Sequence, residues 1–423
     1  MSKFTVEGKQ RLSGLLKVNG AKNSALKLMA ASLLGQGIFW IEDVPQIADV
    51  LTMCGVLRAL GVEAELANNR LNLVVNSLQG RPPWDLVRSM RASIQIMGPL
   101  LAKLGWVEVA KPGGCAIGAR PLDLHLSGFE KMGAVIETTN GLIKARAKRL
   151  QGADITLRYP SVGATENIMM AAVLARGETI IRNAAREPEI VDIQNFLNKM
   201  GARIEGAGGA LIKIKGVTDL GAADFKVIPD RIEAGTYILA ALISQGEITL
   251  ENIVPEHLGA LLDVVKTLGG EIEFKNGRLT VHSPAKLKPF EVSTNPYPGF
   301  PTDLQPQLVV VATQAGGLST LRESVFNQRF GYIPQLEKMG ARIKVKDYTA
   351  FIQGHSPLNG ANLVVSDLRA GAALVLAALA ARGESAISGI EHIDRGYEQM
   401  EEKLSLLGAK IKRSLGKGGL SEK

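Results

Sequence analysis

The chain has 423 residues, enough for two or three domains of ordinary size. Hydrophobic residues make up 46% of it and charged residues 21%, so a packed core is expected and bulk disorder is excluded. The longest uncharged apolar stretch, residues 370–381, is shorter than the roughly 20 residues that a membrane-spanning helix needs.

The charge is moderately basic, with 49 Lys and Arg against 41 Asp and Glu and a net charge of +8. This excess suits an anionic partner without identifying it. The densest basic run, KARAKR at 144–149, is interpreted as an exposed strand and turn, so no nucleic-acid partner is expected. The first ten residues have no apolar core and do not resemble a secretory signal. Two cysteines and five scattered histidines predict neither a disulfide framework nor a metal site, and no cofactor is expected.

Helix-like apolar segments that end in glycine recur along the chain, and a left-handed C-cap is expected at each closing glycine. They span residues 24–37, 92–105, 164–177, 234–246, 304–317 and 370–383. Each is apolar nearly all round, which predicts a buried helix. Alternating runs such as 177–184 and 246–252 follow and predict strands with one buried face.

A second pattern predicts the end of another helix in each repeat. In this pattern a glycine lies between the apolar end of a helix and a strand with alternating apolar residues. Its glycines are Gly61, Gly133, Gly201, Gly269, Gly340 and Gly408, at successive intervals of 72, 68, 68, 71 and 68 residues. Six copies at this period indicate an internal repeat, read as strand, helix, strand, helix, strand, strand. Solenoid repeats are mostly shorter, so we expect an α/β fold of two lobes, three units each, with helices inside and sheets outside.

The junction where each buried helix begins carries a charged residue in five of six units. The residues are Lys22, Arg91, Gly163, Arg231, Asp303 and Arg369. Charge at a buried helix start is costly without a partner or a ligand, and helix N-termini favour anions. A single Arg there is explained by an ion pair, but the recurrence favours a cationic binding site.

Two further residues have chemistry that the composition leaves open. Cys115 lies in the Gly-rich loop 111–125 beside Lys111 and Arg120, where a thiol is either activated or a small buried apolar residue. For Cys54, in an apolar helical stretch, the second interpretation is the better one. A hydrolase triad with His125 as base lacks a supporting motif. Asp303, after three closely spaced prolines, is either a general base or a carboxylate at a helix start.

The order of the motifs resembles the UDP-N-acetylglucosamine 1-carboxyvinyltransferases, which are enolpyruvyl transferases. The motifs are GAKNSAL (20–26), MRASI (90–94), PGGCAIGARPLDLH (112–125), PSVGATEN (160–167), NAAREPEIVD (183–192), PDRIEAGT (229–236), PYPGFPTDLQPQ (296–307), SDLRAGAAL (366–374) and HIDRGYE (392–398). The resemblance implies an inside-out α/β barrel of two domains, each of three βαβαββ units. It also implies that residues 20–229 form an inserted first domain, and residues 1–19 with 230–423 the second.

The resemblance further implies the reaction. The enolpyruvyl group of phosphoenolpyruvate would move to the 3′-hydroxyl of UDP-N-acetylglucosamine with release of phosphate, in the first committed step of peptidoglycan synthesis in the cytoplasm. Cys115 matches the general acid and Asp303 the group that accepts the hydroxyl proton. The motif positions implied to hold the two substrates are Lys22, Asn23, Arg91, Arg120, Pro121, Leu122, Asp123, Leu124, Val325, Arg369 and Arg395.

Two positions depart from the family pattern. Lys27 stands where the family usually has proline, and Tyr159 where some members have lysine. The rival within the fold is a 3-phosphoshikimate enolpyruvyl transferase, against which the Cys115 loop argues. From another class, a basic repeat scaffold that binds nucleic acid depends only on the charge and the repeat.

Overall fold

The structure, a computed structural model, describes residues 2–111 and 122–414. The chain divides into two compact units with a boundary after Asn19 and another after Ile228. We call residues 20–228 the central unit, and residues 2–19 with 229–414 the terminal unit. Each unit has a hydrophobic core of its own.

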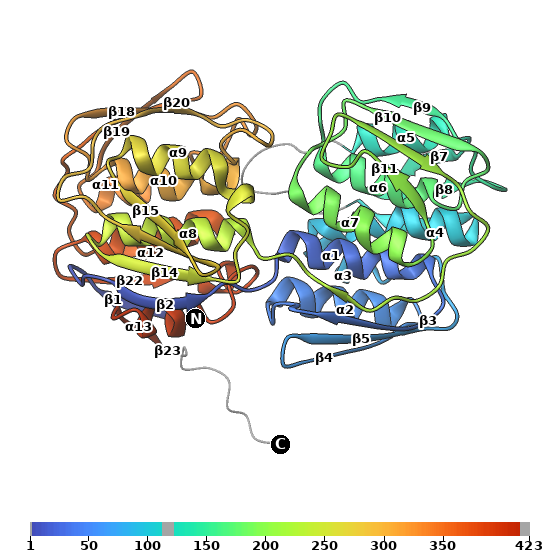
Figure 1. Ribbon diagram of the computed structural model, residues 1–423, viewed down its shortest axis with the longest axis horizontal. Helices are drawn as coiled ribbons and strands as arrows, with labels where there is room; N and C mark the ends of the chain where they lie inside the picture. The colour runs from blue at the N-terminus through green and yellow to red at the C-terminus, as the bar shows by residue number, and fades with distance from the viewer. Residues whose placement is uncertain (1, 112–121, 415–423) are drawn as a thin grey trace. The chain divides into compact units, whose positions relative to one another are not determined.

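Among the described residues the central unit contains three sheets, with buried helices between them (Figure 1). Its elements are α1 (Lys22–Ala31), η1 (Ser32–Leu34), β3 (Gly37–Glu42), α2 (Ala48–Ala59), β4 (Glu63–Ala67), β5 (Arg70–Val75), α3 (Trp84–Ser89), η2 (Arg91–Ile96), α4 (Met97–Leu104), β6 (Trp106–Ala110), α5 (Asp123–Lys131), β7 (Val135–Thr139), β8 (Leu142–Arg146), β9 (Asp154–Thr156), α6 (Val162–Ala172), β10 (Glu178–Arg182), α7 (Pro188–Lys199), β11 (Arg203–Glu205), β12 (Leu211–Lys215) and β13 (Phe225–Lys226).

The terminal unit repeats this plan with three sheets of its own. Its elements are β1 (Lys3–Glu7), β2 (Ser13–Lys17), α8 (Arg231–Ile243), β14 (Glu247–Glu251), η3 (Pro255–Leu258), α9 (Gly259–Thr267), β15 (Glu271–Lys275), β16 (Arg278–His282), β17 (Glu291–Ser293), η4 (Thr302–Leu304), α10 (Gln305–Ala312), β18 (Leu318–Arg322), α11 (Ile333–Lys338), β19 (Arg342–Lys346), β20 (Thr349–Gln353), β21 (Asn362–Val364), α12 (Leu368–Ala380), β22 (Glu384–Ser388), η5 (Ile390–His392), α13 (Met400–Leu406) and β23 (Lys410–Ser414).

The helices predicted to be apolar all round are the inner ones. In α12 every residue from Arg369 to Ala380 is buried, and α6 is buried from Ala164 to Ala172. The strands instead alternate between buried and exposed residues, as in β10. Helices therefore fill the middle of each unit and sheets form its outside, as expected for an inside-out α/β barrel.

Two of the six repeats form a sheet entirely from four strands that are consecutive in the sequence. These are β9 to β12 and β17 to β20, each with one parallel edge pair and two antiparallel pairs. Three other sheets are completed by distant strands: β1 joins β22 and β23, β2 pairs with β14, and β13 pairs with β3. The sheet β6-β8-β7 has three strands among the described residues. The six repeats are therefore similar in sequence, but they differ in which segments of the chain contribute the strands of each sheet.

The recurrent glycines end the outer helices, as the pattern predicts. All six have positive φ, from +89° at Gly133 to +109° at Gly201. In each copy the residue after the glycine donates its N–H to the carbonyl five residues back, for example Val62 to Leu57 at 3.0 Å. This is the Schellman arrangement, which satisfies free carbonyls at a helix end and favours glycine.

The left-handed caps predicted for the inner helices are mostly wrong. Only Gly105 caps its helix in this way, with φ +74° after α4. The other inner helices end three to five residues before their closing glycines, which are Gly37, Gly177, Gly246, Gly317 and Gly383. At the end of α8 the left-handed residue is Gln245, with φ +53°, and Gly246 has ordinary backbone geometry. Gly246 is needed for space, because a Cβ there would lie 2.1 Å from the carbonyl oxygen of Leu12.

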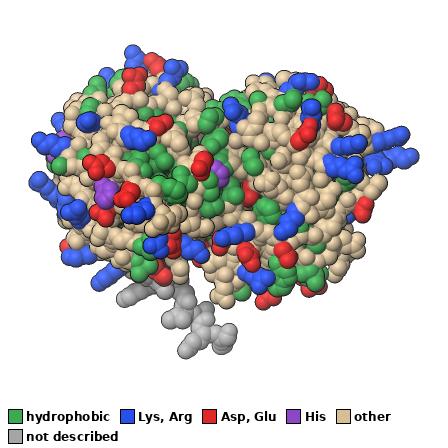
Figure 2. All heavy atoms as spheres, in the orientation of Figure 1, with side chains coloured by type: hydrophobic (Ala, Val, Ile, Leu, Met, Phe, Trp, Pro, Cys, Tyr) green, Lys and Arg blue, Asp and Glu red, His purple; other side chains and the backbone are tan. Residues whose placement is uncertain are grey.

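The basic run 144–149 forms the end of β8 and the turn after it, as interpreted from the sequence. Lys144, Arg146 and Lys148 line a shallow surface groove of about 680 Å³ with Arg81 and Trp106. On the face drawn in Figure 2, Lys and Arg side chains are otherwise spread among Asp and Glu and form no continuous basic stripe. In the described ranges, no helix has the length and apolar character needed to span a bilayer.

Candidate active site

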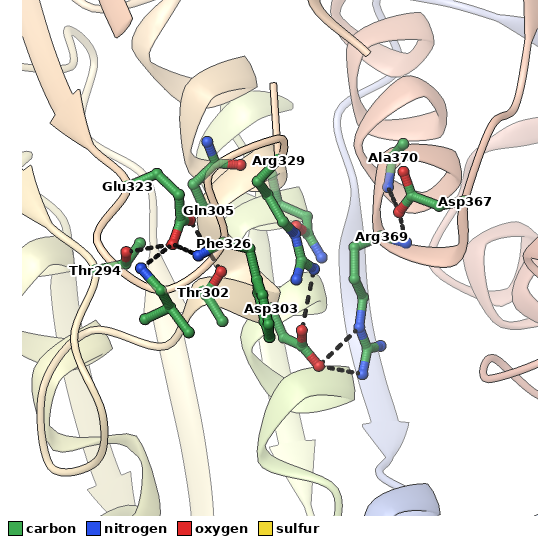
Figure 3. A network of polar contacts seen from close by, with 12 residues as sticks. Thr294, Thr302, Asp303, Gln305, Glu323, Phe326, Arg329, Asp367, Arg369 and Ala370 are labelled. Atoms are coloured by element: carbon green, nitrogen blue, oxygen red, sulfur yellow. Dashed lines mark hydrogen bonds and ion pairs between the residues drawn. The ribbon is translucent and has the colours of Figure 1, made fainter. Parts of the chain in front are cut away.

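Asp303 lies at the centre of an ion-pair cluster in the terminal unit (Figure 3). It occupies the single turn η4, directly after Pro301, whose extended backbone begins the turn. Its Oδ1 accepts from Arg329 Nη2 at 3.0 Å, and its Oδ2 accepts from Arg369 Nη2 at 3.0 Å and Nε at 3.2 Å. The Asp303 side chain keeps 27% of its surface exposed, whereas the two guanidinium groups are almost completely buried. A carboxylate that two cations hold in place and that is still partly exposed is suited to contact a ligand.

Arg369 is placed by the start of α12. Asp367 caps this helix by accepting from the backbone N–H groups of Arg369 and Ala370 at 3.0 and 3.1 Å. The guanidinium lies 5.5 Å from the centroid of the Tyr397 ring. Burial by itself would lower the pKa of Arg369, but Asp303, Tyr397 and Asp230 together outweigh it and the pKa is raised. Arg369 therefore stays positive at every physiological pH.

Arg329 is the cation that sequence reasoning missed. It lies in the loop after β18, away from the six helix starts, and its side chain is 2% exposed. Its Nε and Nη1 atoms have no hydrogen-bond partner within the described part of the chain. A buried guanidinium with two spare donors is a strong site for an anionic oxygen. None of the motifs that carry the family resemblance includes Arg329.

Val325 is held by a buried carboxylate. Glu323 accepts from the backbone N–H of Val325 at 2.8 Å and of Phe326 at 3.1 Å, and from the hydroxyls of Thr294 and Thr302 at 2.7 and 2.9 Å (Figure 3). These four bonds fix the loop that follows β18 against the Asp303 turn. Val325 is half-buried at the edge of this loop.

The HIDRGYE segment brings Arg395 to the same unit. Arg395 is half-buried, two residues before Tyr397. The Tyr397 hydroxyl lies 2.8 Å from Thr236 Oγ1 and 3.3 Å from Gln307 Nε2, which ties the segment to α8 and α10. Of the predicted site residues, the terminal unit thus holds Asp303, Val325, Arg369 and Arg395.

The central unit holds a second group, led by Lys22. Lys22 is the first residue of α1, and its Nζ lies 2.7 Å from Oδ2 of Asp49 in the first turn of α2. Both side chains are at most 10% exposed, so the pair is largely desolvated. Asn23 follows, and its carbonyl accepts from Lys27 Nζ at 2.9 Å. Asp49 was not expected from the sequence, because no motif marks it.

The remaining central residues also begin helices. Arg91 is the first residue of η2, and Leu122, Asp123 and Leu124 lie at the start of α5. Asp123 forms an ion pair with Arg158, next to the departure at Tyr159. Cys115, Arg120 and Pro121 lie outside the described residues.

His125 does not fit the role of a catalytic base. Its ring is buried, and Asn167 Nδ2 lies 3.1 Å from its Nδ1. Burial and the nearby Arg91 lower its pKa to about 4, so it binds a proton weakly at neutral pH. Within residues 2–111 and 122–414, no group of three or more His, Cys, Asp or Glu residues is arranged to hold a metal ion.

Comparison with known proteins agrees with this architecture. The family described as EPSP synthase (3-phosphoshikimate 1-carboxyvinyltransferase) matches residues 6–404. The enolpyruvyl transferase NikO from Streptomyces tendae superposes with a TM-score of 0.88 at 26% identity, over 98% of this chain and 99% of that one. EPSP synthase from Acinetobacter baumannii shares the fold, with a TM-score of 0.75 at 20% identity over 98% of this chain and 100% of that one.

The family match over residues 6–404 and the shared fold therefore identify the chain as an enolpyruvyl transferase. Among more similar sequences, UDP-N-acetylglucosamine 1-carboxyvinyltransferase 2 from Carboxydothermus hydrogenoformans is 51% identical, over 98% of this chain and 99% of the relative. The chain belongs to the UDP-N-acetylglucosamine 1-carboxyvinyltransferase family, as its motifs indicate.

Proposed function

We propose that this chain transfers the enolpyruvyl group of phosphoenolpyruvate to the 3′-hydroxyl of UDP-N-acetylglucosamine and releases phosphate. The observation that carries the proposal is the partly exposed Asp303 carboxylate, which two buried guanidinium groups hold in place in a chain of this family. The product would enter peptidoglycan synthesis, and with it cell-wall formation, cell shape and division, in the cytoplasm. No cofactor takes part in the proposed reaction.

The chemistry requires one acid and one base. Cys115 is proposed to give its thiol proton to the methylene carbon of phosphoenolpyruvate, which builds oxocarbenium character at the adjacent carbon. The 3′-oxygen of the sugar bonds to that carbon while its proton passes to Asp303. In the elimination the Cys115 thiolate takes a proton back from the new methyl group while the bond between the carbon and the phosphate oxygen breaks. The departing phosphate takes the proton held by Asp303, which leaves the enol ether, free phosphate and the enzyme in its starting state.

Asp303 is suited to act as the general base because two arginines fix the position of its carboxylate. Arg329 and Arg369 bind different oxygens of the carboxylate, so the group cannot rotate freely. A fixed carboxylate keeps the reacting oxygen in one orientation. The same two cations can stabilise negative charge that builds up on the substrates.

The substrate anions need several cations. We assign Lys22, Arg120 and Arg395 to the phosphate and carboxylate of phosphoenolpyruvate, with Asn23 beside them, because forked guanidinium groups grip both ends in one geometry. Arg91 and Arg369 support this set. Residues 120–124 and Val325 are proposed to hold the UDP-sugar. In this assignment residues 20–229 are the inserted domain that carries Cys115, and residues 1–19 with 230–423 are the other domain.

Phosphate release is the test. We expect release from phosphoenolpyruvate with UDP-N-acetylglucosamine and none with shikimate 3-phosphate; the opposite preference would favour the rival transferase. Asp303→Ala should lose turnover by a large factor while the affinity for the sugar nucleotide changes little. Cys115→Ala should also be inactive, and an unchanged rate in either variant would remove that residue from the mechanism. Salt-sensitive binding of nucleic acid that persists in both variants would support the scaffold alternative.

A further inference from the structure

A buried polar network lies inside the central unit where its inner helices begin. Lys27 of α1 and Glu166 of α6 form its ion pair, with Nζ 3.5 Å from Oε2. Glu166 is completely buried, and the Lys27 side chain is 11% exposed.

The ion pair is connected to two helix starts. Lys27 Nζ also donates to the carbonyl of Asn23 at 2.9 Å, one turn back in α1. Gln95 Nε2, from η2, donates to Glu166 Oε2 at 3.0 Å and to the carbonyl of Gly163 at 3.2 Å. The first turns of α1 and α6 are thereby joined to η2, the element that begins with Arg91.

The next residue of α6 extends the network. Asn167 Nδ2 donates to the carbonyl of Ile94 at 3.0 Å and contacts His125 Nδ1 at 3.1 Å, and its Oδ1 accepts from the Gly98 N–H at 2.7 Å. The network therefore also reaches α4 and α5. Every described helix start to which we assign a substrate contact in this unit lies within one or two turns of it.

Stability alone does not account for the pair. Two buried charges lose their hydration, and an apolar pair of similar volume is often as stable or more stable. The network is also incompletely bonded, because Glu166 Oε1 and Gln95 Oε1 have no hydrogen-bond partner in the described part of the chain. A group of charges that contributes little net stability but joins three functional helix starts is better explained by the geometry it imposes.

We propose that Lys27 and Glu166 are positioning residues for substrate binding: their ion pair, with Gln95, sets the first turns that carry Asn23 and Arg91. This inference rests on the proposed function. Lys27 acts on Asn23 through its carbonyl, and Glu166 acts on η2 through Gln95, so neither residue needs to touch a substrate.

Three variants test the proposal: Lys27→Met, Glu166→Gln, and the double variant that carries both changes. Steady-state phosphate release is measured with each substrate varied in turn, and thermal unfolding is followed in parallel. We expect the KM for phosphoenolpyruvate to rise about tenfold in Lys27→Met, with a smaller change in kcat. Glu166→Gln leaves Lys27 with an unpaired charge and should lower the unfolding temperature as well.

The double variant separates position from stability. Its two neutral side chains remove the buried charges, so its unfolding temperature should return close to that of the wild type, whereas its KM stays raised because Asn23 has lost its donor. The matched control is Ile181→Ala in β10, a buried residue outside the network, which should unfold at a lower temperature with an unchanged KM.

The outcomes are distinguishable. A double variant with the wild-type KM, or a KM that rises equally in Ile181→Ala, overturns the inference and leaves the network a structural one. If the wild type is active and both single variants keep its KM, the inference is wrong but the proposed function stands. A wild type that releases no phosphate overturns the proposed function and the inference together.

Discussion

Asp192 gives a quantitative prediction about pH and stability. It lies in α7 with 2% of its surface exposed, and the Ser24 hydroxyl donates to its Oδ2, which also lies 3.5 Å from the Ile228 N–H. None of the ion pairs among the described residues includes it. Burial raises the pKa of Asp192 to about 7, and the two hydrogen bonds offset only part of this effect.

The direction of the pH dependence of stability follows from the proton that Asp192 retains in the folded state. Below about pH 4 this carboxyl is protonated in both the folded and the unfolded chain, so stability is fully present there. As the pH rises toward 7 the unfolded chain releases the proton first, and the free energy of unfolding falls. A shift from 3.8 to about 7 corresponds to roughly 4 kcal/mol in total, of which about 3 kcal/mol lies between pH 5 and 8.

Asp192→Asn removes this titration and keeps an oxygen that can accept from Ser24. Urea unfolding of wild type and variant at pH 5, 6, 7 and 8 gives the difference in unfolding free energy, from which the contributions of other groups cancel. We expect the variant to gain about 3 kcal/mol relative to the wild type across this range. Glu63→Gln, an exposed carboxylate in β4, is the control and should leave the difference flat. If the unfolding free energies of Asp192→Asn and the wild type change in parallel with pH, the reasoning is refuted.

Three more predictions concern single side chains. Tyr397→Phe keeps the ring against Arg369 but removes the buried hydroxyl, so kinetics should show a severalfold rise in the KM for phosphoenolpyruvate, and Tyr397→Leu a larger one. Asp230→Ala removes the cap that accepts from two N–H groups of α8 and should cost about 1 kcal/mol in urea unfolding; no change would contradict the capping role. Burial raises the pKa of the Cys54 thiol, so intact-mass analysis should show fosfomycin on Cys115 and none on Cys54 in the native protein; equal labelling of both would argue against an activated Cys115.

The sequence by itself determined the features that depend on neighbouring residues. Hydrophobic periodicity located the six inner helices, and the glycine pattern located the six outer helix ends, because both are properties of a single turn or strand. The charged residues at the helix starts could also be identified this way, since Lys22, Arg91 and Arg369 each lie in the first turn or two of an element.

The tertiary structure decided everything that joins distant segments. Asp303 meets Arg329 across 26 residues and Arg369 across 66, and Ser24 meets Asp192 across 168. Such pairings arise only when the repeats close around a common core, so no local pattern marks Arg329 or Asp49. The same closure lets β1, β2 and β13 complete sheets far from them in sequence, because an exposed strand edge is satisfied by whichever segment the fold brings beside it.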